Sequence, residues 1–167
     1  MSSKLIAAKS EISLNKKIFS YSDFYVFLRK TLQERGYYIE EKSYTHSETS
    51  PLKNVSFYWN TVKNVDDFTK YIIELKVSLS LEDVTVIKDK KKEMNSRGEG
   101  SITVRATLQT DYEGKWEETN AIISFIKVLF ENIFQKGSID EHSKRLADEA
   151  YEIENEIKSY FSMQRMI

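Results

Sequence analysis

Five basic side chains lie close together near the middle of the chain, in the segment 88–100. They are Lys88, Lys90, Lys91, Lys92 and Arg97. Clustered cations bind phosphate oxygens and release counterions from a nucleic acid without reading its sequence. The segment lacks the compact glycine-rich, Lys-Ser/Thr spacing of a phosphate loop. Two interpretations therefore stay open: a solvated, mobile hairpin tip, or a contact surface for RNA or another phosphate-bearing partner.

The sequence contains no comparable cluster of residues suited to catalysis. The chain contains no cysteine, and neither His46 nor His142 has a second histidine at a metal-ligand spacing. The acidic segment 111–117 falls short of the ligand pattern of a calcium loop. We identify no catalytic residue, no metal site and no cofactor, and the sequence favours a protein that is not an enzyme.

Two segments of the last third of the chain are apolar at helical spacing. The segment 119–136 leaves only a narrow polar stripe, so its apolar arc exceeds that of an ordinary surface helix. A final helix to about residue 163 follows a capping box at 138–141 and has a coiled-coil-like apolar seam. These faces are either packed within the monomer or form a partner interface. The candidate interface residues are Ile122, Ile126, Leu129, Phe130, Ile133, Phe134, Leu146, Ile153, Ile157 and Tyr160.

The elements that position these groups are indicated by changes of hydrophobic period. A strand ending near Phe19, a helix from Ser22 to Gly36 and a strand at 37–44 are followed by a predicted loop at 46–54. Residues 55–60, 71–81, 84–86 and 102–108 then alternate apolar and polar side chains. A period of two over such lengths is typical of antiparallel strands with one face on the core.

The sequence therefore predicts an α+β fold, with an antiparallel meander sheet packed against helices and a C-terminal helical hairpin. Its 167 residues fit a single domain spanning 1–167. No apolar stretch reaches the roughly 20 residues of a membrane span. The lack of cysteine removes any need for an oxidising compartment, so we expect a cytoplasmic location. A net charge of −1 argues against a surface built entirely for nucleic acid.

Several short runs also resemble known proteins. The stretch from Trp59 through 66–68, 98–100 and 111–117 to the closing helices resembles a family of small archaeal proteins with no assigned activity, over about two thirds of the chain. The element order resembles the helix-grip fold of START-like proteins, in which a curved antiparallel sheet grips a long C-terminal helix around an apolar ligand cavity. This chain departs from that pattern, because two closing helices are predicted and only one helix follows the first strand.

Three functions follow from these patterns. The leading hypothesis is a non-catalytic interaction module that self-associates or binds a macromolecular partner through the apolar helices. The helix-grip resemblance implies a carrier of a small apolar ligand, held between the aromatic strand face and the segment 119–136. The third hypothesis is an RNA- or ribosome-associated factor that uses the basic hairpin.

Overall fold

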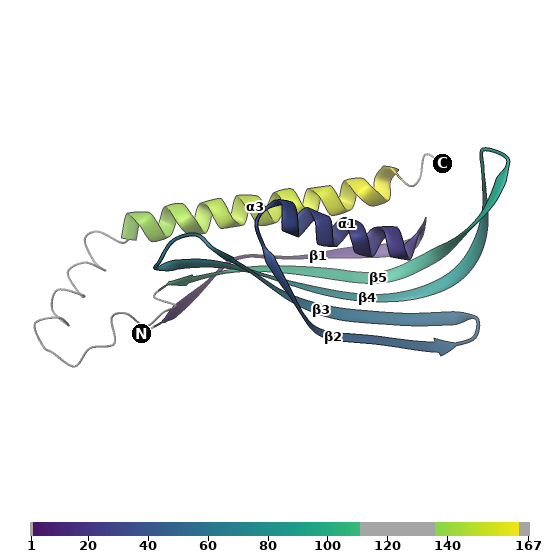
Figure 1. Ribbon diagram of the computed structural model, residues 1–167, viewed down its shortest axis with the longest axis horizontal. Coiled ribbons are helices and arrows are strands. Elements are labelled where there is room, and N and C mark those ends of the chain that lie inside the picture. Colours follow the sequence, from purple (N-terminus) through teal and green to yellow (C-terminus); the bar gives the residue numbers. More distant parts are fainter. Residues whose placement is uncertain (1, 111–135, 164–167) are drawn as a thin grey trace, which may run out of the picture.

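The fold was obtained as a computed structural model, which describes residues 2–110 and 136–163. Five strands form one antiparallel sheet in the order β1-β5-β4-β3-β2. Both described helices lie on the same face of this sheet (Figure 1). The predicted α+β class with an antiparallel sheet is therefore confirmed. The elements are β1 (Ser3–Phe19), α1 (Tyr21–Glu34), β2 (Tyr38–Thr49), β3 (Leu52–Asn64), β4 (Thr69–Lys88), β5 (Lys91–Thr110) and α3 (Lys136–Met163).

The core lies between the sheet and the two helices. Alternation along β3 and β4 places one row of side chains under the helices, where Trp59, Ile73 and Leu75 are fully buried. Burying such apolar rows is the main force that holds the sheet to the helices. The helices contribute Phe24, Leu28 and Leu32 from α1, and Leu146, Ala150, Ile153, Ile157 and Phe161 from α3.

Helix α1 begins at Tyr21, with only Ser20 between it and the end of β1 at Phe19. Ser20 is its N-cap, and the Ser20 hydroxyl accepts a hydrogen bond from the Asp23 N–H at 3.3 Å. The predicted cap, Ser22, is instead inside the first turn. Gly36 adopts a φ of +86° just beyond the helix, and its N–H donates to the Gln33 carbonyl. The expected glycine stop is thus confirmed, because this left-handed conformation favours glycine.

The predicted loop at 46–54 is wrong. Strand β2 continues to Thr49, which pairs directly with Leu52 at the start of β3. The connection is only Ser50 and Pro51, joined by a cis peptide bond. Strand β2 lies at the edge of the sheet and is exposed along nearly its whole length, so it lacks the apolar period that identifies a buried strand. The proline occupies the turn, where no ladder hydrogen bond is lost.

The basic hairpin is also more regular than predicted. Strand β4 extends to Lys88 and β5 starts at Lys91, so the turn contains only Asp89 and Lys90. Both turn residues have positive φ, at 48° and 64°, as a type I′ hairpin turn requires. Neighbouring strands end earlier, at the pairs Phe19–Ser96 and Leu52–Glu82. Residues 83–95 therefore form a two-stranded ribbon, here named the arm, which bends toward the helix-covered side (Figure 1).

Helix α3 is a single helix that packs on the sheet. Its helical residues include Gly137 and Ser138, so the predicted stop at Gly137 and the predicted cap at Ser138 are both wrong. Of the segment 119–136, only Lys136 falls among the described residues, and the first half of the predicted helical hairpin lies outside them. The seam of α3 contacts β1, β5 and α1 instead.

Candidate anion-binding arm and groove

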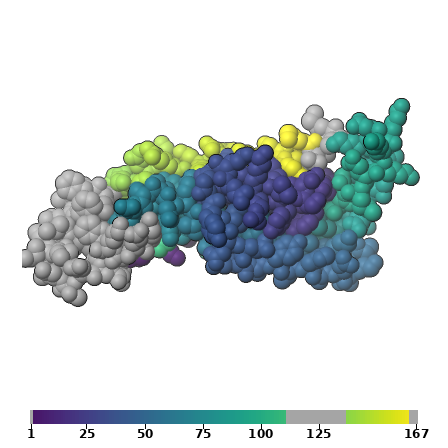
Figure 2. Space-filling model, in the orientation of Figure 1, coloured from purple at the N-terminus to yellow at the C-terminus, as the bar shows by residue number. Residues whose placement is uncertain are grey.

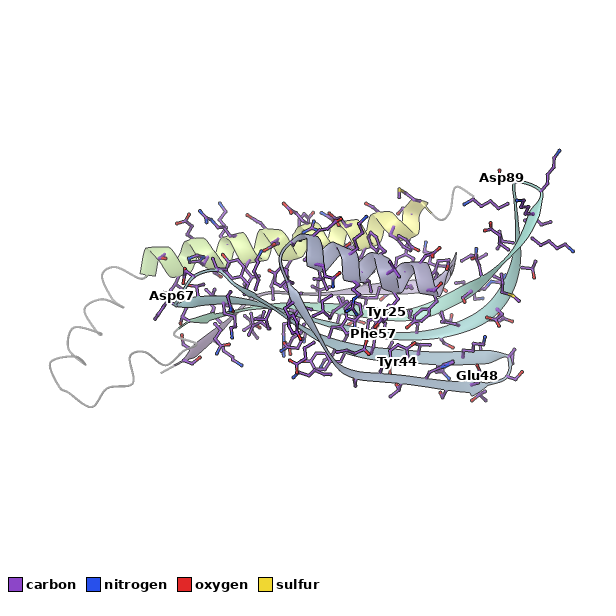
Figure 3. All side chains as sticks on the ribbon, viewed as in Figure 1. Tyr25, Tyr44, Glu48, Phe57, Asp67 and Asp89 are labelled. Carbon is purple, nitrogen blue, oxygen red and sulfur yellow. The ribbon has the colours of Figure 1, made fainter. Side chains whose placement is uncertain are left out.

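The tip of the arm gathers four of the predicted phosphate contacts. Lys88 and Lys91 are cross-strand partners, Lys90 lies in the turn, and Lys92 pairs with Ile87. All four lysines are exposed. None of them forms an ion pair with a carboxylate of the described residues. Figure 2 shows the arm projecting from the end of the molecule, and Figure 3 labels Asp89 at its tip. The tip therefore presents four lysines against one carboxylate, that of Asp89, on a hydrogen-bonded ribbon.

Arg97, the fifth predicted contact, lies at the base of the arm. It is the cross-strand partner of Glu82, and its Nη1 lies 3.7 Å from the Glu82 Oε2. An opposite charge on the paired residue partly neutralises the guanidinium. The structure thus separates Arg97 from the four lysines, whose charge has no such partner.

A groove of about 310 Å³ lies where the arm faces the end of β1 and the start of α1. Lys88 and Glu93 line it from the arm, and Lys16, Lys17 and Asp23 line it from the opposite side. The Phe161 ring, from the end of α3, also borders the groove. Three lysines and two acidic residues therefore line this space, and no ion pair joins them.

A β-bulge places the two lysines of β1 at this groove. The register of β1 against β5 shifts between Leu14 and Lys17, and Lys16 adopts a φ of 50°. Side chains of consecutive residues normally point to opposite faces of a strand, and a bulge interrupts that alternation. The sequence analysis missed Lys16 and Lys17. The adjacent pair of lysines was a visible signal, but nothing local indicated the bulge or the nearby arm.

The aromatic face expected to line a ligand cavity is filled by its own side chains. The Tyr25 ring centroid lies 5.1 Å from that of Trp59 and 5.4 Å from that of Phe57, and Tyr44 stacks on Phe57 (Figure 3). Glu41 accepts hydrogen bonds from the Tyr25 hydroxyl at 2.6 Å and the Trp59 Nε1 at 2.8 Å. Burial and the bond to Glu41 raise the pKa of Tyr25. These residues form a packed cluster, which gives no support to the ligand-carrier hypothesis.

A second charged cluster fastens α3 to the rest of the fold. The Lys63 Nζ lies 2.6 Å and 2.9 Å from the two carboxylate oxygens of Glu149, which also accepts the Tyr37 hydroxyl at 3.0 Å. Arg35 forms an ion pair with Glu156, about two turns of α3 beyond Glu149. Burial and the Glu149 carboxylate raise the pKa of Tyr37. We call these five residues the clamp, and their mutual satisfaction indicates a structural role.

The apolar seam of α3 is part of the core. Leu146, Ile153 and Ile157 are buried between α3 and the sheet. Tyr160 is half-buried and stacks on Phe27, with 4.6 Å between the ring centroids. The monomer itself thus covers four of the predicted partner-interface residues. The other six, Ile122, Ile126, Leu129, Phe130, Ile133 and Phe134, lie outside the described residues.

The histidines do not form a metal site within the described ranges. His142 Nδ1 is hydrogen-bonded to the Tyr71 hydroxyl at 2.8 Å, and its Nε2 lies 3.8 Å from Asp66 Oδ2. His46 is on the exposed edge strand, 3.7 Å from Glu48. No group of three or more His, Cys, Asp or Glu side chains in residues 2–110 and 136–163 is arranged to hold a metal ion. Neither described helix has the length and apolar character needed to cross a membrane.

Comparison of the chain with family models, with curated proteins and with solved structures found no match. The resemblances to the archaeal family and to the helix-grip fold therefore stay predictions. Function has to be argued from the arm, the groove and the clamp themselves.

Proposed function

We propose that the protein is a non-catalytic interaction module that binds RNA, free or at the surface of a ribonucleoprotein, through its arm. The observation that carries this proposal is the group Lys88, Lys90, Lys91 and Lys92, exposed together without an ion-pair partner in the described chain. Exposed cations without an ion-pair partner are suited to phosphate oxygens, because binding releases the counterions condensed on the nucleic acid.

The shape of the arm supports the same function. A two-stranded ribbon holds its side chains through a continuous ladder of backbone hydrogen bonds, here from the pair Asp83–Ser96 to the pair Lys88–Lys91. Lysine ammonium groups act as point charges, so they fix position on a phosphate backbone without reading bases. We therefore expect binding that depends strongly on salt and weakly on RNA sequence.

Two exposed apolar side chains on the arm add a contact of another kind. Ile87 is 70% exposed and Met94 is 72% exposed, and both lie within a few residues of the lysines. Apolar groups next to cations can pack on unstacked bases or on the protein component of a ribonucleoprotein. Helix α3 carries more acidic than basic side chains and would repel phosphate, so the arm is the favoured contact surface.

Self-association through the segment 119–136 stays a separate prediction, because that segment lies outside the described residues. Its expected companion, the seam of α3, is occupied by the core. The described residues accordingly favour the arm over the apolar helices as the interaction surface.

Charge reversal of the arm tests the proposal. Fluorescence anisotropy would measure binding of single-stranded and duplex RNA across a salt series. For the variant Lys90→Glu, Lys91→Glu, Lys92→Glu, we expect affinity at low salt to fall by about tenfold or more. The slope of log affinity against log salt should fall by roughly 2 on single-stranded RNA, since three phosphate contacts are removed.

The matched control is Lys4→Glu, Lys9→Glu, Lys144→Glu, which changes the net charge equally at exposed positions outside the arm. This control should keep most of the affinity. Equal losses in the two variants would show a general charge effect, and unchanged binding by the arm variant would remove the arm from RNA recognition.

A further inference from the structure

The groove between β1 and the arm combines three chemistries in one small space. Lys16, Lys17 and Lys88 supply cations, Asp23 and Glu93 supply carboxylate acceptors, and Val86 supplies an apolar surface. Its volume of about 310 Å³ falls at the small end of the range for small-molecule sites, roughly 300–1,000 Å³. We propose that this groove binds one nucleoside phosphate unit, with the phosphate on the lysines and the nucleoside against the carboxylates and the apolar surface.

The arrangement of the cations carries the phosphate part of the proposal. Lys16 and Lys17 line the groove together with their neighbours Asn15 and Ile18, where the register of β1 shifts and Lys16 adopts a φ of 50°. Lys88 reaches the same space from the far strand of the arm. Three lysines thus line the groove from two elements, β1 and the arm, and none of them is ion-paired to a described residue.

The two carboxylates distinguish a nucleotide from a bare anion. A free phosphate or sulfate would be repelled by Asp23 and Glu93, which line the groove from α1 and from the arm. A nucleoside has hydroxyl and amino hydrogens that carboxylates accept, as acidic side chains do with ribose hydroxyls and with cytosine amino groups. The side-chain amides of Asn15 and Asn95 add donors and acceptors for a base edge.

The groove extends the proposed RNA binding by adding a site for a single nucleotide. Only the source of that nucleotide, an RNA strand held by the arm, rests on the proposed function. The groove adjoins the arm through Lys88, so an RNA strand held at the tip can place one nucleotide in it. A free nucleotide has the same chemistry. The variants below separate these sources, because Lys16 and Lys17 lie on β1 and the other arm lysines lie at the tip.

Isothermal titration calorimetry with the four nucleoside 5′-monophosphates, and with inorganic phosphate, tests the site on the full chain. At least one monophosphate should bind with a Kd below about 1 mM and more tightly than phosphate. The variant Lys16→Glu, Lys17→Glu should weaken that binding by about tenfold or more, since each lost contact is a charge-assisted hydrogen bond. The matched control Lys4→Glu, Lys144→Glu should bind as the wild type does.

Thermal unfolding of each variant would establish that it folds. If the charge-reversed pair does not fold, Lys16→Gln, Lys17→Gln removes the two charges without reversing them and should still weaken binding. The proposal is overturned if no monophosphate binds with a Kd below about 1 mM, if phosphate binds as tightly as the nucleotides, or if folded Lys16 and Lys17 variants bind normally.

The arm variant Lys90→Glu, Lys91→Glu, Lys92→Glu separates this site from RNA binding. We expect this variant to bind RNA more weakly than the wild type and to bind the monophosphate with unchanged affinity. RNA binding by the wild type without monophosphate binding would overturn the groove proposal and leave the arm proposal standing. Monophosphate binding without RNA binding would support the groove, identify a free nucleotide as its source, and overturn the arm proposal.

Discussion

The clamp and the arm both hold basic side chains, but they treat the charge in opposite ways. In the clamp, Lys63 and Arg35 face Glu149 and Glu156, and the Lys63 side chain is only 24% exposed. At the tip of the arm, the lysines are exposed and have no carboxylate partner in the part of the chain that the structure describes. Charge that is paired and half-buried stabilises a fold, whereas charge left unpaired in water is available to a ligand. The two regions thus divide the basic residues into a structural set and a binding set.

The largest expected effect on stability is loss of the clamp. Glu149→Ala removes both carboxylate contacts of the Lys63 Nζ and leaves a half-buried cation with only the Arg35 carbonyl as its acceptor. We expect the free energy of unfolding to fall by roughly 2–3 kcal/mol, measured by urea titration. RNA binding by the folded fraction should be unchanged.

The control for that change is Glu152→Ala, whose carboxylate is 68% exposed and 3.9 Å from Arg35. An exposed pair at that distance contributes less than about 1 kcal/mol. If both variants lose the same stability, the clamp is not a cooperative structural unit and the division drawn above is wrong.

An intermediate effect is expected on the face of the sheet opposite the two described helices (Figure 1). Glu74 accepts hydrogen bonds there from Arg105 and from the Tyr58 hydroxyl, and these contacts lower the pKa of Glu74. A lowered pKa in the folded state adds stability above the unfolded value, near 4.5, and this stability is lost as pH falls through the folded value. Glu74→Gln should lose about 1 kcal/mol at pH 7.

The difference between wild type and Glu74→Gln should shrink toward zero as the pH is lowered well below 4.5, because both side chains are then uncharged. Urea unfolding at several pH values measures this convergence. A constant difference at every pH would show that the substitution acts through packing and not through the charge of Glu74. The charge of Glu74 would then belong to neither the structural set nor the binding set.

The smallest effect on stability is expected in the arm. The variant Lys90→Glu, Lys91→Glu, Lys92→Glu removes no ion pair that the described residues contain. Its free energy of unfolding should therefore stay within about 0.5 kcal/mol of the wild type, although its affinity for RNA falls. A loss of stability comparable to that of Glu149→Ala would show that the arm lysines belong to the structural set.

Hydrophobic period located most of the elements, and it failed where an element has no core face. The alternation from Tyr71 to Leu81 and the glycine stop at Gly36 were sufficient for β4 and α1, because burial and backbone conformation act locally there. The exposed edge strand β2 has no such period, and its far half was mistaken for a loop. The sequence predicts helix α3, but it does not predict that the apolar seam of α3 packs on the sheet.

The candidate site divides in the same manner. The density of lysines at residues 88–92 is visible in the sequence, and so is the absence of any cysteine. Joining Lys16 and Lys17 to Lys88 required the pairing of β1 with β5, the bulge between Leu14 and Lys17, and the bend of the arm. Likewise, only the register that pairs Glu82 with Arg97 removed Arg97 from the free cations.

The sequence by itself determined the α+β class, the strongly alternating strands, the first helix and the basic tip, because each follows from side-chain period or composition within a short window. The tertiary structure decided which charges are paired, which face of α3 is buried, and which lysines share a groove. These outcomes depend on strand register and bending, which arise from contacts between residues far apart in the chain. A local pattern specifies an element, and only the folded chain specifies its neighbours.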